Sequence, residues 1–101
     1  MTIPSSVRAL LHDLEVPPEP SGVDWERTII ERVMARGGWA DMRWLLASFG
    51  RARLAAFLAD RGQRTLPPRE VRFWATVCHA GQGQADRWVA SAIEAEQAWR
   101  G

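Results

Sequence analysis

A series of closely spaced glycine and proline breaks constrains this chain more than any other feature. The breaks fall at Gly37-Gly38, at Gly50 and from Gly62 to Pro68. Glycine just beyond a periodic apolar segment usually ends a helix, because only glycine enters the left-handed region without steric cost. The breaks therefore predict several short helices that pack orthogonally, rather than a bundle of long parallel ones.

Apolar residues recur at the i, i+3, i+4, i+7 spacing that marks one face of a helix. The alternation of apolar and polar residues that is typical of strands is missing. We expect helices at about 4–15, from 21 or 24 to 36, at 39–48 and 51–61, from 67 to the Gly81 region, and from there to the end. The predicted fold class is all-α, a compact orthogonal bundle of about six short helices.

Two local features follow from these helices. Ser21 and Asp24 have the spacing of a capping box, with aspartate in place of the usual glutamate. The side chains expected to point inward on the second helix and on the last one are Trp25, Ile29, Val33 and Met34, and Trp88, Ala92, Ile93 and Trp99.

A chain of 101 residues predicts one domain, residues 1–101. Within it, residues 16–22 contain three prolines and predict an extended connector, since proline interrupts helices. The connector joins an N-terminal helix in residues 1–15 to a core of residues 23–101. The first helix is therefore expected to dock either away from the core or on a partner.

Targeting signals and disulfides are not expected. The N-terminus has no basic region followed by a long apolar run, and no stretch approaches the ~20 apolar residues of a membrane span. The single cysteine, Cys78, excludes an internal disulfide and predicts a small buried hydrophobic residue. We expect a cytoplasmic protein.

The residue types that often carry out catalysis or bind metals do not occur here at a catalytic or metal-binding spacing. His12 and His79 have no further ligand at metal-binding spacing, and Cys78 and His79, being consecutive, point in different directions on a helix. The Gly81-Gln82-Gly83 turn lacks the lysine and the preceding strand of a phosphate loop. We expect no enzyme activity, no metal and no cofactor.

Arginine is concentrated in the middle of the chain. Residues 43–72 contain seven arginines and two acids, whereas both flanks are acidic. Such charge is most often a solvated face, but it also suits nucleic acid or an acidic protein surface. Tryptophans lie near these arginines, and some of them are expected to anchor a partner rather than the core. The residues we expect at a partner interface are Trp39, Arg43, Trp44, Arg51, Arg53, Arg64, Arg69 and Arg72.

A helix-turn-helix-like DNA-binding protein is the alternative. The helices expected at 51–61 and from 67 onward are short, basic and closely connected. The second begins Pro67-Pro68-Arg69-Glu70-Val71-Arg72, so two arginines reach a groove, but it lacks the amide side chains that usually read bases.

Three blocks of the sequence resemble a family of small prokaryotic proteins encoded beside AbiEii-like nucleotidyltransferases, which are the toxins of one toxin–antitoxin class. The blocks are DWERTIIERVMARG from Asp24 to Gly37, DMRWLLASFG from Asp41 to Gly50, and LPPREVRFWA from Leu66 to Ala75. They lie between Trp25 and Val77, about half of the chain, and the first two are the most specific.

The resemblance implies an antitoxin-like protein that binds a nucleotidyltransferase and blocks its active-site cleft or substrate surface. Nucleotide-transfer sites are commonly lined by metal-binding carboxylates, which the arginine-rich middle of this chain would pair with. An accessory protein of the same operon is the other implied role. Some antitoxins also bind their operator, and two-fold DNA sites would then require a homodimer.

Overall fold

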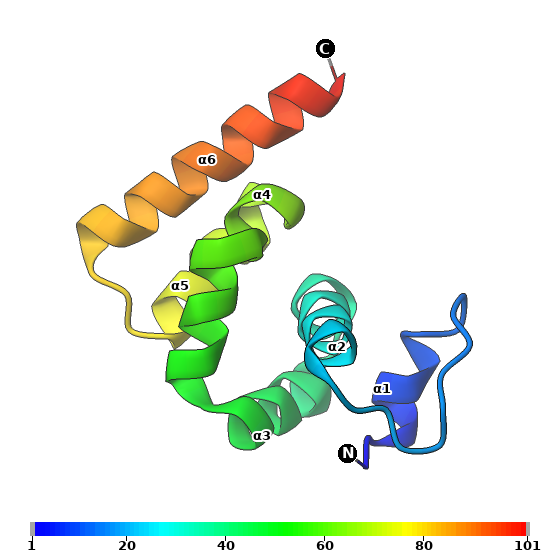
Figure 1. The fold of residues 1–101 in the computed structure, drawn as a ribbon. Helices are drawn as coiled ribbons and strands as arrows, with labels where there is room; N and C mark the ends of the chain where they lie inside the picture. Colours follow the sequence, from blue (N-terminus) through cyan, green and yellow to red (C-terminus); the bar gives the residue numbers. More distant parts are fainter. Residues whose placement is uncertain (1, 101) are drawn as a thin grey trace. The chain divides into compact units, whose positions relative to one another are not determined.

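The structure is a computed structural model that describes residues 2–100, and this range contains helices and turns but no strand. The prediction of an all-α fold with about six short helices is confirmed (Figure 1). No helix within the described range has the length and apolarity to cross a membrane. The helices in chain order are α1 (Ser5–Ala9), α2 (Val23–Arg36), α3 (Trp39–Phe57), the π-helical turn η1 (Leu58–Gly62), α4 (Gln63–Thr65), α5 (Pro68–Val77) and α6 (Gln82–Arg100).

Contacts divide the chain into two units, Met1–Ser48 and Phe49–Gly101. The division falls within α3, next to Gly50, whose φ of 80° and ψ of 160° interrupt the helix. Only glycine adopts these angles readily, and a Cβ at this position would meet nothing within 4 Å, so the backbone rather than space requires glycine. The predicted break at Gly50 is therefore confirmed. A single domain over residues 1–101 stays a prediction.

The N-terminal helix is shorter than the 4–15 predicted from its apolar spacing. It ends at Ala9, and the following residues form turns in which Leu14 N–H bonds the carbonyl of Leu11 at 2.9 Å. In a continuing helix that N–H would bond Leu10 O. Leu10 O instead accepts a hydrogen bond from Arg32 Nη1 at 3.0 Å, and Leu14 is left exposed.

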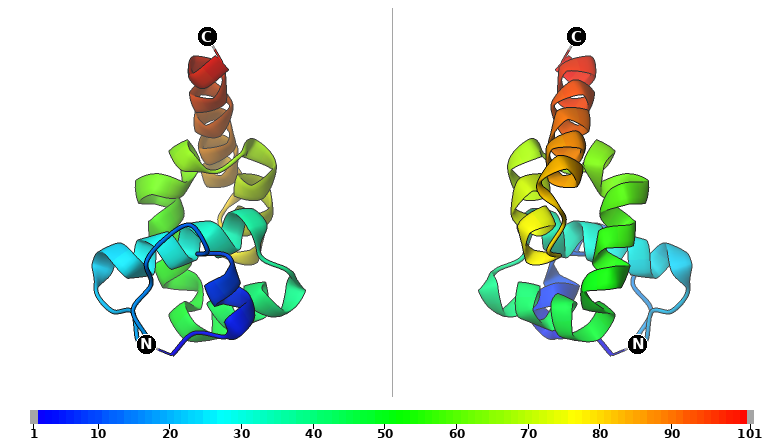
Figure 2. Two further views of the ribbon diagram at one scale, coloured as in Figure 1. Left: turned by 90° about the vertical axis from the view of Figure 1, so that its right-hand side faces the viewer. Right: turned by 90° about the vertical axis from the view of Figure 1, so that its left-hand side faces the viewer.

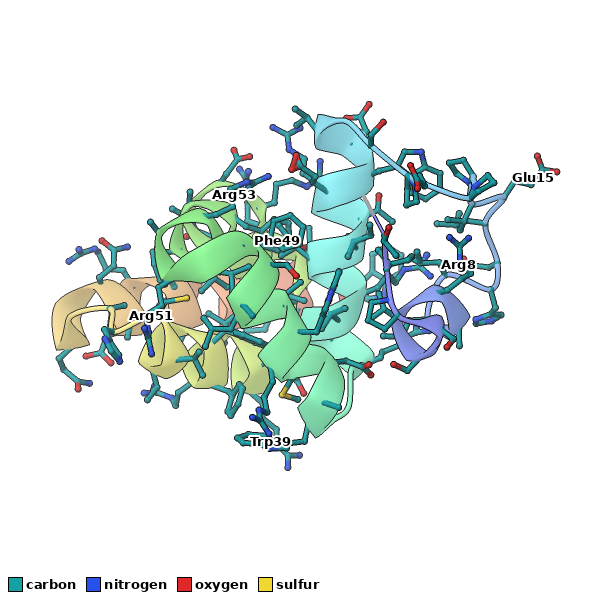
Figure 3. All side chains as sticks on the ribbon, turned by 90° about the horizontal axis from the view of Figure 1, so that it is seen from below. Arg8, Glu15, Trp39, Phe49, Arg51 and Arg53 are labelled. Atoms are coloured by element: carbon teal, nitrogen blue, oxygen red, sulfur yellow. The ribbon has the colours of Figure 1, made fainter. Side chains whose placement is uncertain are left out.

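The N-terminal segment docks on its own unit, so the expectation that it lies away from the core is wrong. Ser6 Oγ donates to Asp41 Oδ1 at 2.6 Å, which links α1 to the start of α3. The connector of residues 16–22 is non-helical as predicted. Arg8 reaches from α1 toward it and donates to Pro18 O at 2.8 Å, whereas Glu15 points away (Figure 3).

The second helix begins at Val23 without a side-chain cap, so the capping box predicted at Ser21 and Asp24 does not form. Trp25 is only half-buried, because the inward stripe begins a turn later. The buried residues of this unit include Ile3, Val7, Leu11, Ile29, Ile30, Val33, Met34 and Leu45, and Asp41 is a buried charged group.

Gly37 ends α2 as predicted, but for a different physical reason. Its φ of −67° is open to any residue. A Cβ here would lie 2.7 Å from Val33 O and 2.9 Å from Val33 Cγ1, so the position has no room for a larger residue.

The second unit begins with the part of α3 from Phe49 onward. The helix predicted to stop near Arg61 continues through η1 and α4 to Thr65, and Gly62 is buried inside it with φ of −55°. Glycine costs a helix about 1 kcal/mol relative to alanine, and burial of Phe57 and Leu58 beside it offsets that cost. The interruption comes instead at Leu66-Pro67, just before α5.

In the second unit, α6 lies along α5 and α4, and its last turns extend past both (Figures 1 and 2). The prediction that Ile93 and Trp99 point inward is wrong, because Ile93 is 44% exposed and Trp99 is 90% exposed. The helices that cover α6 end before they reach its C-terminal turns. The buried residues of this unit include Leu54, Phe57, Leu58, Leu66, Val71, Trp74, Ala75, Cys78, Trp88, Val89 and Ala92.

Candidate protein-interaction surface

Trp39 is the residue of the predicted interface that the structure exposes most clearly. It opens α3 and is 70% exposed, directed away from the helix at its edge (Figure 3). Arg43 is exposed four residues later, so the two side chains are neighbours on one helix face. Trp44, one residue further, is half-buried. An aromatic ring beside an exposed guanidinium is the pairing typical of protein interfaces.

The turn that carries Trp39 is held by a buried carboxylate. Asp41 is 8% exposed, and its Oδ2 accepts the N–H of Gly38, the residue before α3, at 3.0 Å. Its Oδ1 accepts from Ser6 Oγ at 2.6 Å. An acidic residue at the third helical position that bonds back to the N-cap N–H is one half of a capping box. These bonds fix the start of α3, so Trp39 is presented from an ordered backbone.

Three of the predicted interface arginines make contacts within the second unit. Arg51 Nε donates to Val77 O at 3.1 Å, which ties the second part of α3 to the end of α5. Arg64 donates to the carbonyl of Asp60. Arg72 lies 4.0 Å from Asp86 Oδ1, a long contact between two exposed groups. Arg51 therefore has a structural role, and any partner that binds it must compete with that bond.

The other arginines on the predicted interface have free guanidinium groups. Among residues 2–100, the side chains of Arg43, Arg53 and Arg69 make no hydrogen bond or ion pair. Arg53 is half-buried and Arg69 is exposed. Arg51 and Arg53 lie on different sides of α3 (Figure 3), as residues two apart in a helix must. Within this unit, the arginines do not form a single face.

Cys78 and His79 do not form a reactive pair. Cys78 is buried as predicted, and burial raises the pKa of its thiol to about 11, so the thiol is protonated at neutral pH. His79 is exposed and has a φ of 58°. Within residues 2–100, no three His, Cys, Asp or Glu side chains gather as metal ligands would.

Two structural features were not found from the sequence, namely the bonds of Asp41 and the exposure of Trp99. Asp41 gave no signal, because its bonds to Ser6 and Gly38 depend on a contact across 35 residues. Trp99 was placed inward by its helical spacing, and that spacing cannot show where the covering helices end.

The chain matches no protein-family model, and no curated protein or solved structure gives a significant match. The resemblance to the neighbours of AbiEii-like nucleotidyltransferases therefore remains an expectation from the sequence blocks.

Proposed function

We propose that this chain is an antitoxin-like binding protein that neutralises a nucleotidyltransferase toxin by direct protein–protein contact. The observation that carries the proposal is the 70% exposed Trp39 with Arg43 one turn further on α3. Tryptophan and arginine are the residues that most often dominate binding energy at interfaces. The class of partner is supported by the resemblance, whose second block, Asp41 to Gly50, lies on the same helix.

Charge supports the same kind of partner. A nucleotidyl-transfer site presents carboxylates that repel each other when no metal is bound. The unpaired guanidinium group of Arg43, on the same helix face as Trp39, would bind such carboxylates. Arginine suits this role because its planar fork bonds a carboxylate at two atoms. Binding would then compete with the metal and with the nucleotide.

The test is co-expression with the protein encoded by the neighbouring gene, with growth and co-purification as readouts. The neighbour alone is expected to arrest growth, and this chain is expected to restore it and to co-elute. Trp39→Ala should weaken the isolated complex by about 30-fold, the effect of losing about 2 kcal/mol at a hot spot. Arg43→Glu should weaken it and slow association.

Trp99→Ala is the matched control, because Trp99 is also an exposed tryptophan but lies in the other unit. It should leave the complex unchanged. Recovery of growth without co-elution, or equal effects of Trp39→Ala and Trp99→Ala, would contradict the proposed surface. If expression of the neighbouring protein does not affect growth, the proposal that the partner is a toxin is wrong.

DNA binding is a second candidate function, favoured by Arg69, which is exposed in the first turn of α5. If α5 binds a DNA groove, the affinity of the protein for DNA should fall steeply as the salt concentration rises, because each phosphate contact releases counterions. Arg69→Ala should then reduce the salt dependence, while Trp39→Ala should not. If binding to duplex DNA is absent at low salt, this candidate is wrong.

A further inference from the structure

Two polar contacts hold the N-terminal segment, residues 2–14, against α2 and α3. Ser6 Oγ donates to Asp41 Oδ1 at 2.6 Å. Further along the segment, Arg32 of α2 binds Asp13 through two hydrogen bonds, of 2.6 and 3.0 Å. A helix as short as α1 is unstable in water by itself, so α1 is ordered only while the segment is docked. The segment is therefore expected to dock and to open as one unit.

Burial of apolar side chains adds to these contacts. Val7 and Leu11 are 0% and 1% exposed, and α1 lies beside α2 (Figures 1 and 3). Opening the segment exposes both side chains to water, so the docked form predominates. Short elements that are held by few contacts nevertheless open more often than the rest of a domain. Such opening is measurable by hydrogen exchange.

Asp41 joins the N-terminal segment to the turn that presents Trp39. One of its carboxylate oxygens accepts from Ser6, and the other accepts the Gly38 N–H at 3.0 Å. Trp39 follows Gly38 directly and is 70% exposed. A Cβ at Gly37 would lie 3.2 Å from Asp41 Cβ, so the end of α2 also passes close to this side chain. A single carboxylate thus connects the segment, the turn and the start of α3.

Loss of the bond from Ser6 would change the surroundings of this carboxylate. Asp41 is 8% exposed, and a buried carboxylate that loses a hydrogen-bond donor is destabilised. A side chain that turns toward water to replace the donor releases the Gly38 N–H. The first turn of α3, which carries Trp39, would then lose its cap.

We infer that docking of the N-terminal segment controls the surface formed by Trp39 and Arg43, and that Ser6 is a positioning residue for partner binding. The inference rests on the proposed function for the role of that surface, whereas the coupling itself is a property of the free chain. Coupling of this kind is reciprocal. A partner that binds more tightly when the segment is docked also holds the segment closed, by the same factor.

Amide hydrogen exchange of the free chain, followed by NMR, tests the coupling. Ser6→Ala should speed the exchange of the Gly38, Leu11 and Leu14 amides by about tenfold, because it removes a hydrogen bond to a charged group. Ser6→Thr keeps the hydroxyl and should restore slow exchange. Ser5→Ala is the matched control and should change none of these rates. Ser5 is exposed in the same turn of α1, and its side chain makes no hydrogen bond within residues 2–100.

A second variant separates the coupling from a local effect at Ser6. Asp13→Asn weakens the contact with Arg32, which lies away from the α3 turn. If the segment opens as one unit, the exchange of the Gly38 amide should rise in this variant as well. The indole N–H signal of Trp39 should shift in Asp13→Asn and Ser6→Ala, whereas that of Trp88, in the second unit, should not.

The complex with the neighbouring protein tests the consequence for binding. Ser6→Ala should weaken it by about five- to tenfold, and binding should slow the exchange of residues 5–14. A complex that forms but is unaffected by Ser6→Ala contradicts the role of Ser6.

A Gly38 amide that exchanges at the wild-type rate in both Ser6→Ala and Asp13→Asn overturns the inference. So does a Ser6→Thr variant that behaves like Ser6→Ala. These measurements need no partner, so failure of the proposed function and failure of the coupling give different results.

Discussion

In the first unit, polar side chains join segments that are far apart in sequence, whereas in the second unit most side-chain hydrogen bonds are local. Arg32 bonds Asp13 at 2.6 Å and Ser6 bonds Asp41 at 2.6 Å, across 19 and 35 residues. In the second unit, side chains such as Thr76 bond backbone carbonyls one turn away. Arg51 is an exception, because it bonds Val77 O across 26 residues.

The difference accompanies a difference in local structure. The first unit contains the short helix α1 and a proline-rich connector. There the bonds of Arg32 and Asp41 add to the burial of Val7 and Leu11, and Asp41 also orders the turn that carries Trp39. The second unit contains α6, a helix of 19 residues, and buries the large rings of Phe57, Trp74 and Trp88.

The largest expected effect tests the reliance of the second unit on packing. Phe57→Ala should lower the free energy of unfolding by about 3–5 kcal/mol, because its ring is 2% exposed and a cavity would remain. Phe73→Ala is the control, since Phe73 is 41% exposed and only meets the edge of Trp74. It should cost about 1 kcal/mol or less. Chemical denaturation measures both, and equal costs would contradict the packing argument.

The next effect tests the polar bonds of the first unit. Asp41→Ala leaves Ser6 Oγ and the Gly38 N–H without their partner, so unfolding should become easier by about 1–3 kcal/mol. Asp24→Ala should cost about 0.5 kcal/mol or less, because Asp24 is exposed and makes no capping bond. Thermal unfolding compares the two. A larger loss of stability for Asp24→Ala than for Asp41→Ala would support the capping box predicted at the start of α2.

A smaller gain is expected at the end of α5. The N–H groups of His79 and Ala80 bond Thr76 O and Ala75 O, the pattern of a Schellman motif with His79 in the left-handed position at φ of 58°. His79→Gly should stabilise the protein by about 0.5–1 kcal/mol, because glycine adopts this conformation without strain. His79→Ala should bring no such gain. Equal stability of the two variants would argue against strain at this position.

The smallest expected effect concerns the stability of the N-terminal segment at acidic pH. The hydrogen bond from Arg32 lowers the pKa of Asp13 from 3.8 to about 2. The contact therefore stabilises the N-terminal segment above pH 3.8, and this contribution is lost as pH falls toward 2. Amide signals of residues 5–14, followed by NMR, should report loosening in that window. Asp13→Asn should remove the transition, and a transition that persists in this variant would assign it to another carboxyl.

Sequence patterns found the helices and most of their ends, because glycine and proline act through the local backbone. Gly50 and the 16–22 connector are clear cases. The prediction was wrong where a distant residue intervened. Arg32 takes the Leu10 carbonyl and shortens α1. The capping box expected at Ser21 and Asp24 does not form at α2, whereas Asp41 accepts the Gly38 N–H at the start of α3.

The candidate site was predictable only in part. An aromatic residue beside arginine was visible in the sequence, and the structure exposes Trp39 and Arg43 on one helix face. Which arginines are free was not visible, because Arg51 and Arg72 meet partners on other helices. Such contacts depend on how helices pack, and composition cannot show them.

The sequence by itself determined the all-α class and the places where the backbone must turn, because periodicity and glycine or proline geometry are local properties. The tertiary structure decided which of the six tryptophans are exposed. Trp88 and Trp99 lie on the same stripe of α6, yet the first is 6% exposed and the second 90%. Burial depends on where neighbouring helices end, and the sequence pattern of a residue's own helix does not predict that.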